Sequence, residues 1–163
     1  MQTPQIYLPG QAVPELEGTS AGIMRGDDGT RYVLVVPNDP ATDTDVSEWG
    51  CYGKSINGAS SRWDGLLNTQ ELVASDSDLD VLELISKLNA GNESAPFYLP
   101  SQRELALCWA TVPHLFQTDD WYWSSTQYSA HSAWFQSFLN GLQVINYKSY
   151  AGRVRAVRRL IIQ

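Results

Sequence analysis

Residues 133–148, AWFQSFLNGLQVINYK, decide the fold. Two β-prone runs flank Asn140-Gly141, a dipeptide typical of the two-residue turn of a β-hairpin. With such a turn Phe138 would face Gln143, and Trp134 would face Tyr147. Large side chains then lie on both faces of the ribbon, so it is either sandwiched between two layers or buries one face and offers the other as a contact surface.

Further strands are predicted on both sides of this hairpin. Residues 121–126 form a strand before it, and residues 153–160 form the last strand of the chain. Near the start, runs at 21–25 and 31–36 flank the turn-rich tetrapeptide GDDG and predict a second hairpin. Because strands lie at both ends of the sequence and helices in the middle, we expect an α+β domain.

Three short helices are predicted between the strands. The first should begin at Asn68, with Glu71 in capping-box register. The third begins at Ser101, whose partner in the capping box is Glu104, and Pro113 ends it. The second follows three aspartates and has the apolar stripe Val81, Leu84, Ile85 and Leu88. On the third helix, the residues that share a face are Leu105, Cys108, Trp109 and Val112.

The remaining segments predict the domain organisation. Residues 1–18 carry prolines at positions 4, 9 and 14, which suits an extended arm that packs on its own domain or on a neighbour. Residues 19–163 form a single domain. Within it, residues 37–62 are rich in Asp, Ser, Thr, Gly and Asn, which indicates a long irregular surface segment.

Composition and charge exclude several classes of protein. The chain has 163 residues, 43% of them hydrophobic, and no apolar run of the length that a membrane span needs. Membrane insertion is therefore not expected, and the net charge of −7 argues against a nucleic-acid partner. No secretory signal is recognisable at residues 1–10. All 18 acidic side chains precede residue 121, and the basic tail after it should pair with some of them.

Catalytic and metal-binding patterns fail on specific positions. Asp76, Asp78 and Asp80 open a calcium-loop pattern, but Val81 stands where glycine is needed and Lys87 where glutamate is needed. The two histidines and two cysteines have no metal-ligand spacing. A serine-type site would need an acid near the C-terminal serines, and no acidic residue follows position 120. We therefore expect no enzyme activity, no metal and no cofactor.

The stretch 121–150 has instead the chemistry of a recognition surface, because its rings give rigid contact area and its small polar side chains give directional hydrogen bonds. Trp123, Trp134 and Phe138 are expected in the core. The expected ligand-binding residues are Trp121, Tyr128, His131, Gln143, Asn146, Tyr147 and Tyr150.

Several short motifs recur in the order found in one known family: WDGL (63–66) with NT (68–69), YLPS (98–101) with EL (104–105), YWSST (122–126), AW (133–134), Phe138, Gly141, KS (148–149) and RVRAVR (153–158). Over residues 20–160 the chain thus resembles the Lcl C-terminal-type domain. The resemblance implies a C-type-lectin-like fold, related to the formylglycine-generating-enzyme branch and to retroelement-diversified phage proteins. In those relatives the final strands and loops display the ligand-contacting residues.

Two departures from that family limit what the resemblance implies. Residues 38–60 and the arm before Gly18 match none of its motifs, so their role stays open. The calcium-dependent sugar motifs of animal lectins are also missing, so calcium-assisted carbohydrate binding is not implied.

Together these observations predict a non-catalytic recognition module. The resemblance implies a phage virion protein at a tail fibre or receptor-binding tip, which would contact a host-surface protein or glycan as a homo-oligomer. The alternative is a structural virion protein, in capsid decoration or tail assembly, that binds other virion subunits. The proline-spaced arm favours that alternative, since an extended N-terminus could lie across a neighbour.

Overall fold

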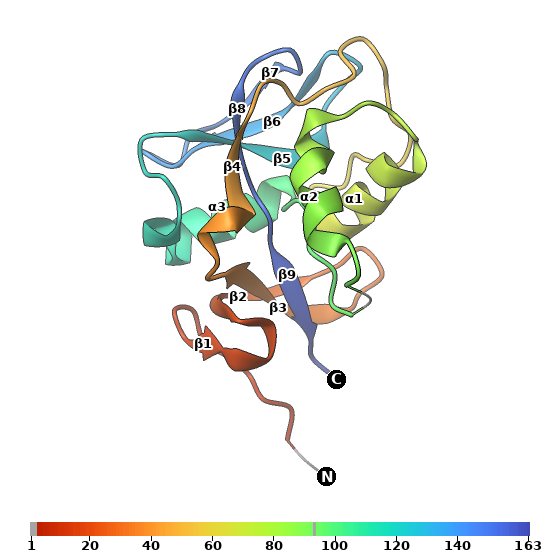
Figure 1. The fold of residues 1–163 in the computed structure, drawn as a ribbon. Helices are drawn as coiled ribbons and strands as arrows, with labels where there is room; N and C mark the ends of the chain where they lie inside the picture. Colours follow the sequence, from red (N-terminus) through yellow and green to blue (C-terminus); the bar gives the residue numbers. More distant parts are fainter. Residues whose placement is uncertain (1–2, 93) are drawn as a thin grey trace.

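The computed structural model describes residues 3–92 and 94–163, and it places two β-sheets toward opposite ends of the molecule, with helices packed between and beside them (Figure 1). The first sheet has the order β1-β2-β3-β9, with bounds Ala12–Val13, Gly18–Arg25, Arg31–Pro37 and Arg158–Ile161. The second has the order β4-β8-β5-β6-β7, with bounds Asp43–Val46, Gly152–Arg155, Trp121–Gln127, Ser132–Ser137 and Gln143–Tyr147. Helices α1, α2 and α3 span Gly65–Ala74, Glu83–Asn89 and Gln102–Thr111. The α+β class is confirmed.

The N-terminal hairpin is confirmed, and the arm before it packs on its own domain from Tyr7 onward. Strand β2 pairs with β3, and β1 pairs with the start of β2. The buried side chains of Tyr7, Val13 and Leu16 contact Val33 and Val35 on β3. The Tyr7 hydroxyl also donates to the Glu15 carboxylate at 2.7 Å. The arm therefore forms part of this domain's own hydrophobic core.

The third helix begins as predicted, whereas the first begins earlier than predicted. At α3, the Ser101 hydroxyl accepts from the Glu104 N–H, and the Glu104 carboxylate accepts from the Ser101 N–H. Helix α1 is capped by Asp64, whose carboxylate accepts from the Leu67 N–H at 3.0 Å. The prediction of Asn68 as the cap was wrong because Asp64 supplies a stronger acceptor one turn earlier. Asn68 lies inside α1 and is fully buried.

The β6–β7 hairpin forms, but its loop is longer than the predicted two residues. Gln136 pairs with Gln143 and Trp134 with Ile145, a shift of two residues that leaves every side chain on its predicted face. The reason is Phe138, which leaves the ladder and enters the core, where its ring stacks on Phe116 at 4.2 Å. Burying this ring outweighs two further residues of hairpin pairing.

Strand β4 lies inside the segment predicted to be irregular. It pairs with β8, so that Asp43 lies opposite Arg155 and Asp45 opposite Arg153. The Arg153 guanidinium binds both carboxylates, at 3.0 Å to Asp43 and 2.7 Å to Asp45. The single strand predicted at 153–160 is divided into β8 and β9, because Val157 between them pairs with Tyr98 instead.

Charged side chains also join the two halves of the fold. The Arg159 guanidinium on β9 lies 3.1 Å from the Asp64 carboxylate and 3.3 Å from that of Glu104, and all three are buried. The Tyr98 hydroxyl donates to Glu104 at 2.8 Å. Burial raises the pKa of Glu104, and the nearby Arg159 opposes that rise. The prediction that the basic tail pairs with acidic groups elsewhere is confirmed.

None of the helices in the described ranges 3–92 and 94–163 combines the length and the apolar character that crossing a bilayer requires.

Candidate recognition surface

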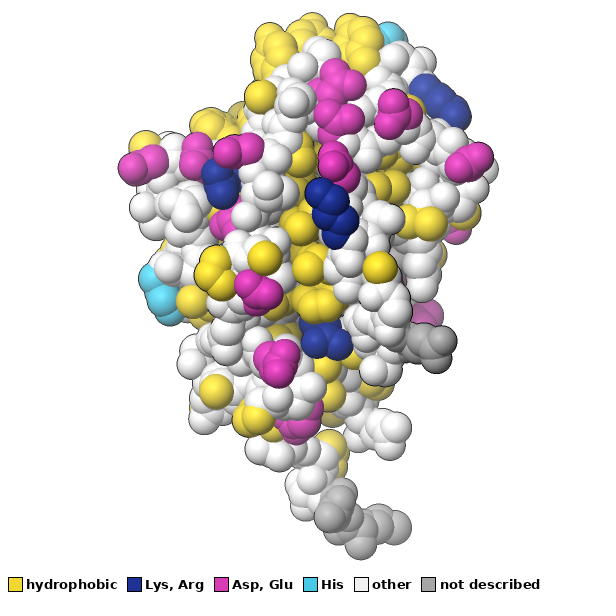
Figure 2. Space-filling model, in the orientation of Figure 1, with side chains coloured by type: hydrophobic (Ala, Val, Ile, Leu, Met, Phe, Trp, Pro, Cys, Tyr) yellow, Lys and Arg dark blue, Asp and Glu magenta, His cyan; other side chains and the backbone are white. Residues whose placement is uncertain are grey.

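Four rings gather at one end of the molecule, and we call them the tyrosine tip: Tyr52, His131, Tyr147 and Tyr150. The Tyr52 ring centroid lies 5.0 Å from that of His131 and 6.2 Å from that of Tyr147, and Tyr147 lies 5.9 Å from Tyr150. Each contact is edge to face, which rings favour even without full burial. The three tyrosines stay 50–54% exposed. Figure 2 shows hydrophobic side chains, with a histidine beside them, collected at the upper end of the molecule.

Backbone hydrogen bonds fix the loops under these rings. The loops are residues 49–56, 128–131 and 147–150. Lys148 donates its N–H to the His131 carbonyl, and its own carbonyl accepts from the Trp49 N–H, both at 2.8 Å. The Gly53 N–H donates to the Ala130 carbonyl at 2.9 Å. Since main-chain bonds hold all three loops together, the tip is preorganised for contact.

A buried lysine strengthens this framework from inside. The Lys148 ammonium donates to the Lys54 carbonyl at 2.9 Å and to the Gln127 side-chain oxygen at 2.8 Å, and it lies 4.7 Å from the centre of the Trp49 ring. No carboxylate of the described residues lies within ion-pair distance of it. Burial therefore lowers the pKa of Lys148 to about 8. The Lys148 side chain thus ties the 147–150 loop to the 49–56 loop and to the end of β5.

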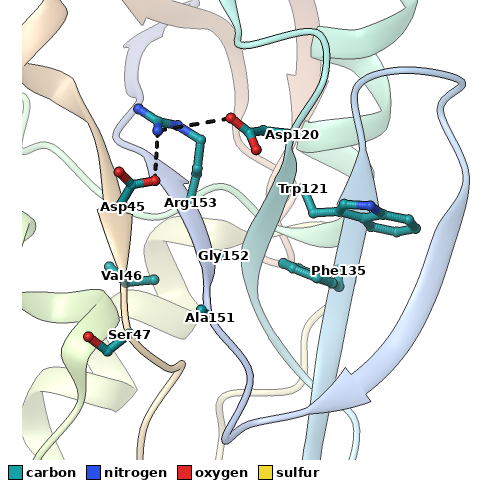
Figure 3. A pocket seen from close by; sticks show the side chains of 9 residues that line it. All are labelled: Asp45, Val46, Ser47, Asp120, Trp121, Phe135, Ala151, Gly152 and Arg153. Atoms are coloured by element: carbon teal, nitrogen blue, oxygen red, sulfur yellow. Dashed lines mark hydrogen bonds and ion pairs between the residues drawn. The ribbon is translucent and has the colours of Figure 1, made fainter.

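A groove of about 490 Å³ opens beside the tip, and we call it the tryptophan groove (Figure 3). It forms because β5 and β8 run parallel and pair only where Tyr122 meets Arg153. Trp121 stacks on Phe135 in this groove, with ring centroids 5.2 Å apart. At one end Arg153 reaches the Asp120 carboxylate at 4.0 Å as well as that of Asp45 (Figure 3). The lining residues are Asp45, Val46, Ser47, Asp120, Trp121, Phe135, Ala151, Gly152 and Arg153.

Gly152 is required where the chain passes from the tip into the groove. A Cβ atom there would lie 2.6 Å from the Phe135 ring and 3.0 Å from the Trp123 ring nitrogen. The indole N–H of Trp123 also donates to the Tyr150 carbonyl at 3.3 Å. The buried rings of β5 and β6 thus set the position of Tyr150 at the tip.

The structure does not bring the predicted ligand-binding residues together at one site. Only His131, Tyr147 and Tyr150 meet in the tip, while Trp121 lies in the groove. Tyr128 is 55% exposed and packs edge-on against Trp134, 6.0 Å away.

Gln143 and Asn146 make local hydrogen bonds. The Gln143 amide donates to the Gln102 carbonyl at 2.7 Å and to the Gln136 side chain at 2.6 Å, which fixes β7 against α3. The Asn146 side chain accepts from the Tyr147 N–H at 2.8 Å, and it points to the opposite face of β7 from Tyr147. Gln143 therefore has a structural role, and Asn146 binds its own neighbour in the chain.

Sequence reasoning missed Tyr52, which contacts two of the tip rings. It lies in the segment predicted to be irregular, and a lone tyrosine there carried no periodic signal. The core predictions for Trp123 and Phe138 are confirmed, because both are buried, whereas Trp134 is only half-buried.

The groups at this end of the molecule can form stacking contacts and hydrogen bonds. The tip presents ring edges, hydroxyls and an imidazole, and the groove adds an indole face and carboxylates. Within the described residues no group of three or more His, Cys, Asp or Glu side chains is placed to hold a metal ion. The Cys108 thiol lies buried in the hydrophobic core, and this burial raises its pKa.

Comparison with known proteins gives a structural likeness. No family model matches this chain, and no curated protein matches its sequence. In structure the chain is similar to a fimbrial protein from Bacteroides ovatus ATCC 8483, with a TM-score of 0.65 and 11% sequence identity. The likeness covers 98% of this chain and 49% of that protein, so the chain spans about half the length of the solved structure. At 11% sequence identity this likeness shows a shared fold alone.

Proposed function

We propose that this chain is a non-catalytic recognition domain and that the tyrosine tip is its ligand-contacting surface. The observation that carries the proposal is the combination of exposure and rigidity at the tip. Three tyrosines remain half-exposed at one end of the molecule, although hydrogen bonds and the buried Lys148 hold their loops in place. Tyrosine gives large contact area at low entropic cost, which suits a preformed binding surface.

The proposal includes display on an extracellular appendage. Its support is the shared fold with a protein named as fimbrial. A narrower form of the proposal places the domain at a phage tail fibre or receptor-binding tip, with a C-type-lectin-like fold, and rests on the sequence resemblance alone. In either form the ligand is a protein or glycan on a cell surface.

The structural alternative, a subunit that binds other subunits through its arm, has less support. Its main argument was an extended N-terminus available to a neighbour. From Tyr7 onward that segment packs on β3 of its own domain.

Cell binding tests the proposal. The fluorescently labelled chain would be added to a panel of bacterial strains, and bound label would be measured by flow cytometry. The variant Tyr52→Ser/Tyr147→Ser/Tyr150→Ser should lose about tenfold or more in affinity, since contact residues of this type dominate binding energy. The matched control, Leu139→Ser/Leu142→Ser/Ile161→Ser, changes equally exposed side chains outside the tip and should bind like the original chain. Equal binding by the tip variant would contradict the proposal.

A further inference from the structure

A second surface, which shares no residue with the tyrosine tip, combines arginines with an exposed and a half-buried tryptophan. The Arg103 guanidinium lies 5.3 Å from the centre of the Trp63 ring, and that of Arg62 lies 5.4 Å from the Trp134 ring. The Arg103 N–H donates to the Arg62 carbonyl at 2.9 Å, so the two pairs adjoin. Trp63 is 52% exposed. We call this surface the arginine face, and it consists of Arg25, Arg31, Arg62, Trp63, Arg103 and Trp134.

The charges on this face are unusual for an acidic chain. All four of its arginines are exposed, and none has a carboxylate of the described residues within 4.0 Å. By contrast, Arg153, Arg155 and Arg159 are all paired with carboxylates. A guanidinium stacked on an indole keeps its N–H edge available for a carboxylate. The arginine face therefore offers several free charge-assisted donors.

The same face contains an apolar groove of about 500 Å³. Aliphatic side chains from β2 and α3 line it together with arginines and Trp63. Its lining residues are Ile23, Met24, Arg25, Arg31, Trp63, Arg103 and Leu107. Strand β1 pairs with β2 only at Gly18 and Thr19, so among the described strands none covers the outer edge of β2 beside Ile23. An extended chain segment would find room along this edge.

We propose that the arginine face binds an acidic segment of a partner protein that also carries aliphatic side chains. The arginines would bind its carboxylates, and the groove would take its aliphatic side chains. The apolar lining favours a peptide over a sugar, because it offers few hydrogen-bond partners for hydroxyl groups. Tryptophan and arginine are also enriched among the residues that dominate protein interfaces. This site shares no residue with the tyrosine tip and does not depend on the function proposed there.

A peptide-binding experiment tests the site. A labelled synthetic peptide that alternates Glu with Leu would be titrated with the full chain, and binding followed by fluorescence polarisation. Two comparison peptides replace Leu with Ser or Glu with Lys. We expect the Glu–Leu peptide to bind about tenfold or more tightly than either, because both the carboxylates and the aliphatic side chains find partners.

Two charge reversals locate the binding. Arg103→Glu should weaken binding of the Glu–Leu peptide by about tenfold or more, and Arg25→Glu should act in the same direction. The matched control is Lys87→Glu, an equally large charge change at an exposed lysine on α2, which should leave binding within about twofold. The tip variant Tyr52→Ser/Tyr147→Ser/Tyr150→Ser should bind the peptide like the original chain, so this site and the tip fail independently.

Three outcomes would overturn the inference. The first is a Glu–Leu peptide that binds no more tightly than the Glu–Ser peptide, since the groove would then contribute nothing. The second is unchanged binding after both arginine reversals in variants that retain the circular dichroism spectrum of the original chain. The third is binding of heparin, but not of the peptide, that Arg103→Glu abolishes, because the face would then recognise an acidic polysaccharide.

Discussion

At the scale of single residues, Lys148 connects stability to the tip. Its side chain is fully buried, and its two hydrogen-bond acceptors belong to the 49–56 loop and to the end of β5. Lysines are almost never fully buried without a carboxylate partner, so this one deserves a physical reason. A neutral amine keeps two N–H donors, which is the number that Lys54 and Gln127 accept.

The first prediction concerns Lys148→Met. The pKa of Lys148 is about 8 in the folded chain and 10.5 ordinarily, so between these values the unfolded chain binds more protons. The lysine's contribution to the free energy of unfolding therefore increases as the pH rises from 8 to 10.5. In the upper part of this range we expect the variant to lose about 1–3 kcal/mol relative to the original chain, because two acceptors lose their donor.

Urea unfolding at a series of pH values measures this difference. Other groups titrate equally in both chains, so their effects cancel when the two are subtracted. A difference that stays constant between pH 8 and 10.5 would show that Lys148 is not held in a desolvated site.

At the scale of elements, α3 shows how a local motif fixes a larger arrangement. Its capping box satisfies two backbone N–H groups, and the Ser101 hydroxyl also donates to the Trp63 carbonyl at 3.0 Å. The cap therefore links the start of α3 to the segment before α1. Trp63 and Arg103 face each other partly for this reason.

The second prediction concerns Ser101→Ala. It removes both hydrogen bonds of a fully buried hydroxyl, and we expect a loss of about 1–2 kcal/mol in the free energy of unfolding. Chemical denaturation measures it, with the exposed Ser149→Ala as the control that should change stability by less than about 0.5 kcal/mol. If the two variants were equally stable, the cap would contribute nothing to the fold.

Local signals in the sequence predicted the elements that depend on them. The capping box of α3 and the GDDG hairpin need only neighbouring residues, and both form as predicted. Strand β4 could not be predicted, because its polar residues Asp43 and Asp45 are stabilised by Arg153, more than a hundred residues away. The hairpin register depended in the same way on where the ring of Phe138 is buried.

The candidate site also contains residues that the sequence could indicate and one that depends on distant contacts. His131, Tyr147 and Tyr150 could be selected from the composition of the C-terminal strands. Tyr52 joins them only because the Trp49 N–H and the Gly53 N–H bind loops from the other end of the chain. Gln143 was selected for its amide, and that amide is used to hold β7 on α3.

At the scale of the whole molecule, the buried charged groups that stabilise the fold and the exposed rings of the tyrosine tip lie in different regions. The buried Arg159, Asp64 and Glu104 network joins the first sheet to α1 and α3 in the interior. The tyrosine tip lies at the end of the molecule formed by the second sheet (Figure 1), and its three tyrosines stay half-exposed. This separation allows tip residues to change without unfolding the domain.

The thermal unfolding midpoint of Tyr52→Ser/Tyr147→Ser/Tyr150→Ser, measured by differential scanning calorimetry, decides whether the tyrosine tip is a surface for binding. We expect a midpoint within about 3 °C of the original chain, because half-exposed rings add little to stability. A midpoint lower by about 10 °C or more would mean that the three tyrosines are structural, and the tip would then no longer be a surface kept for binding.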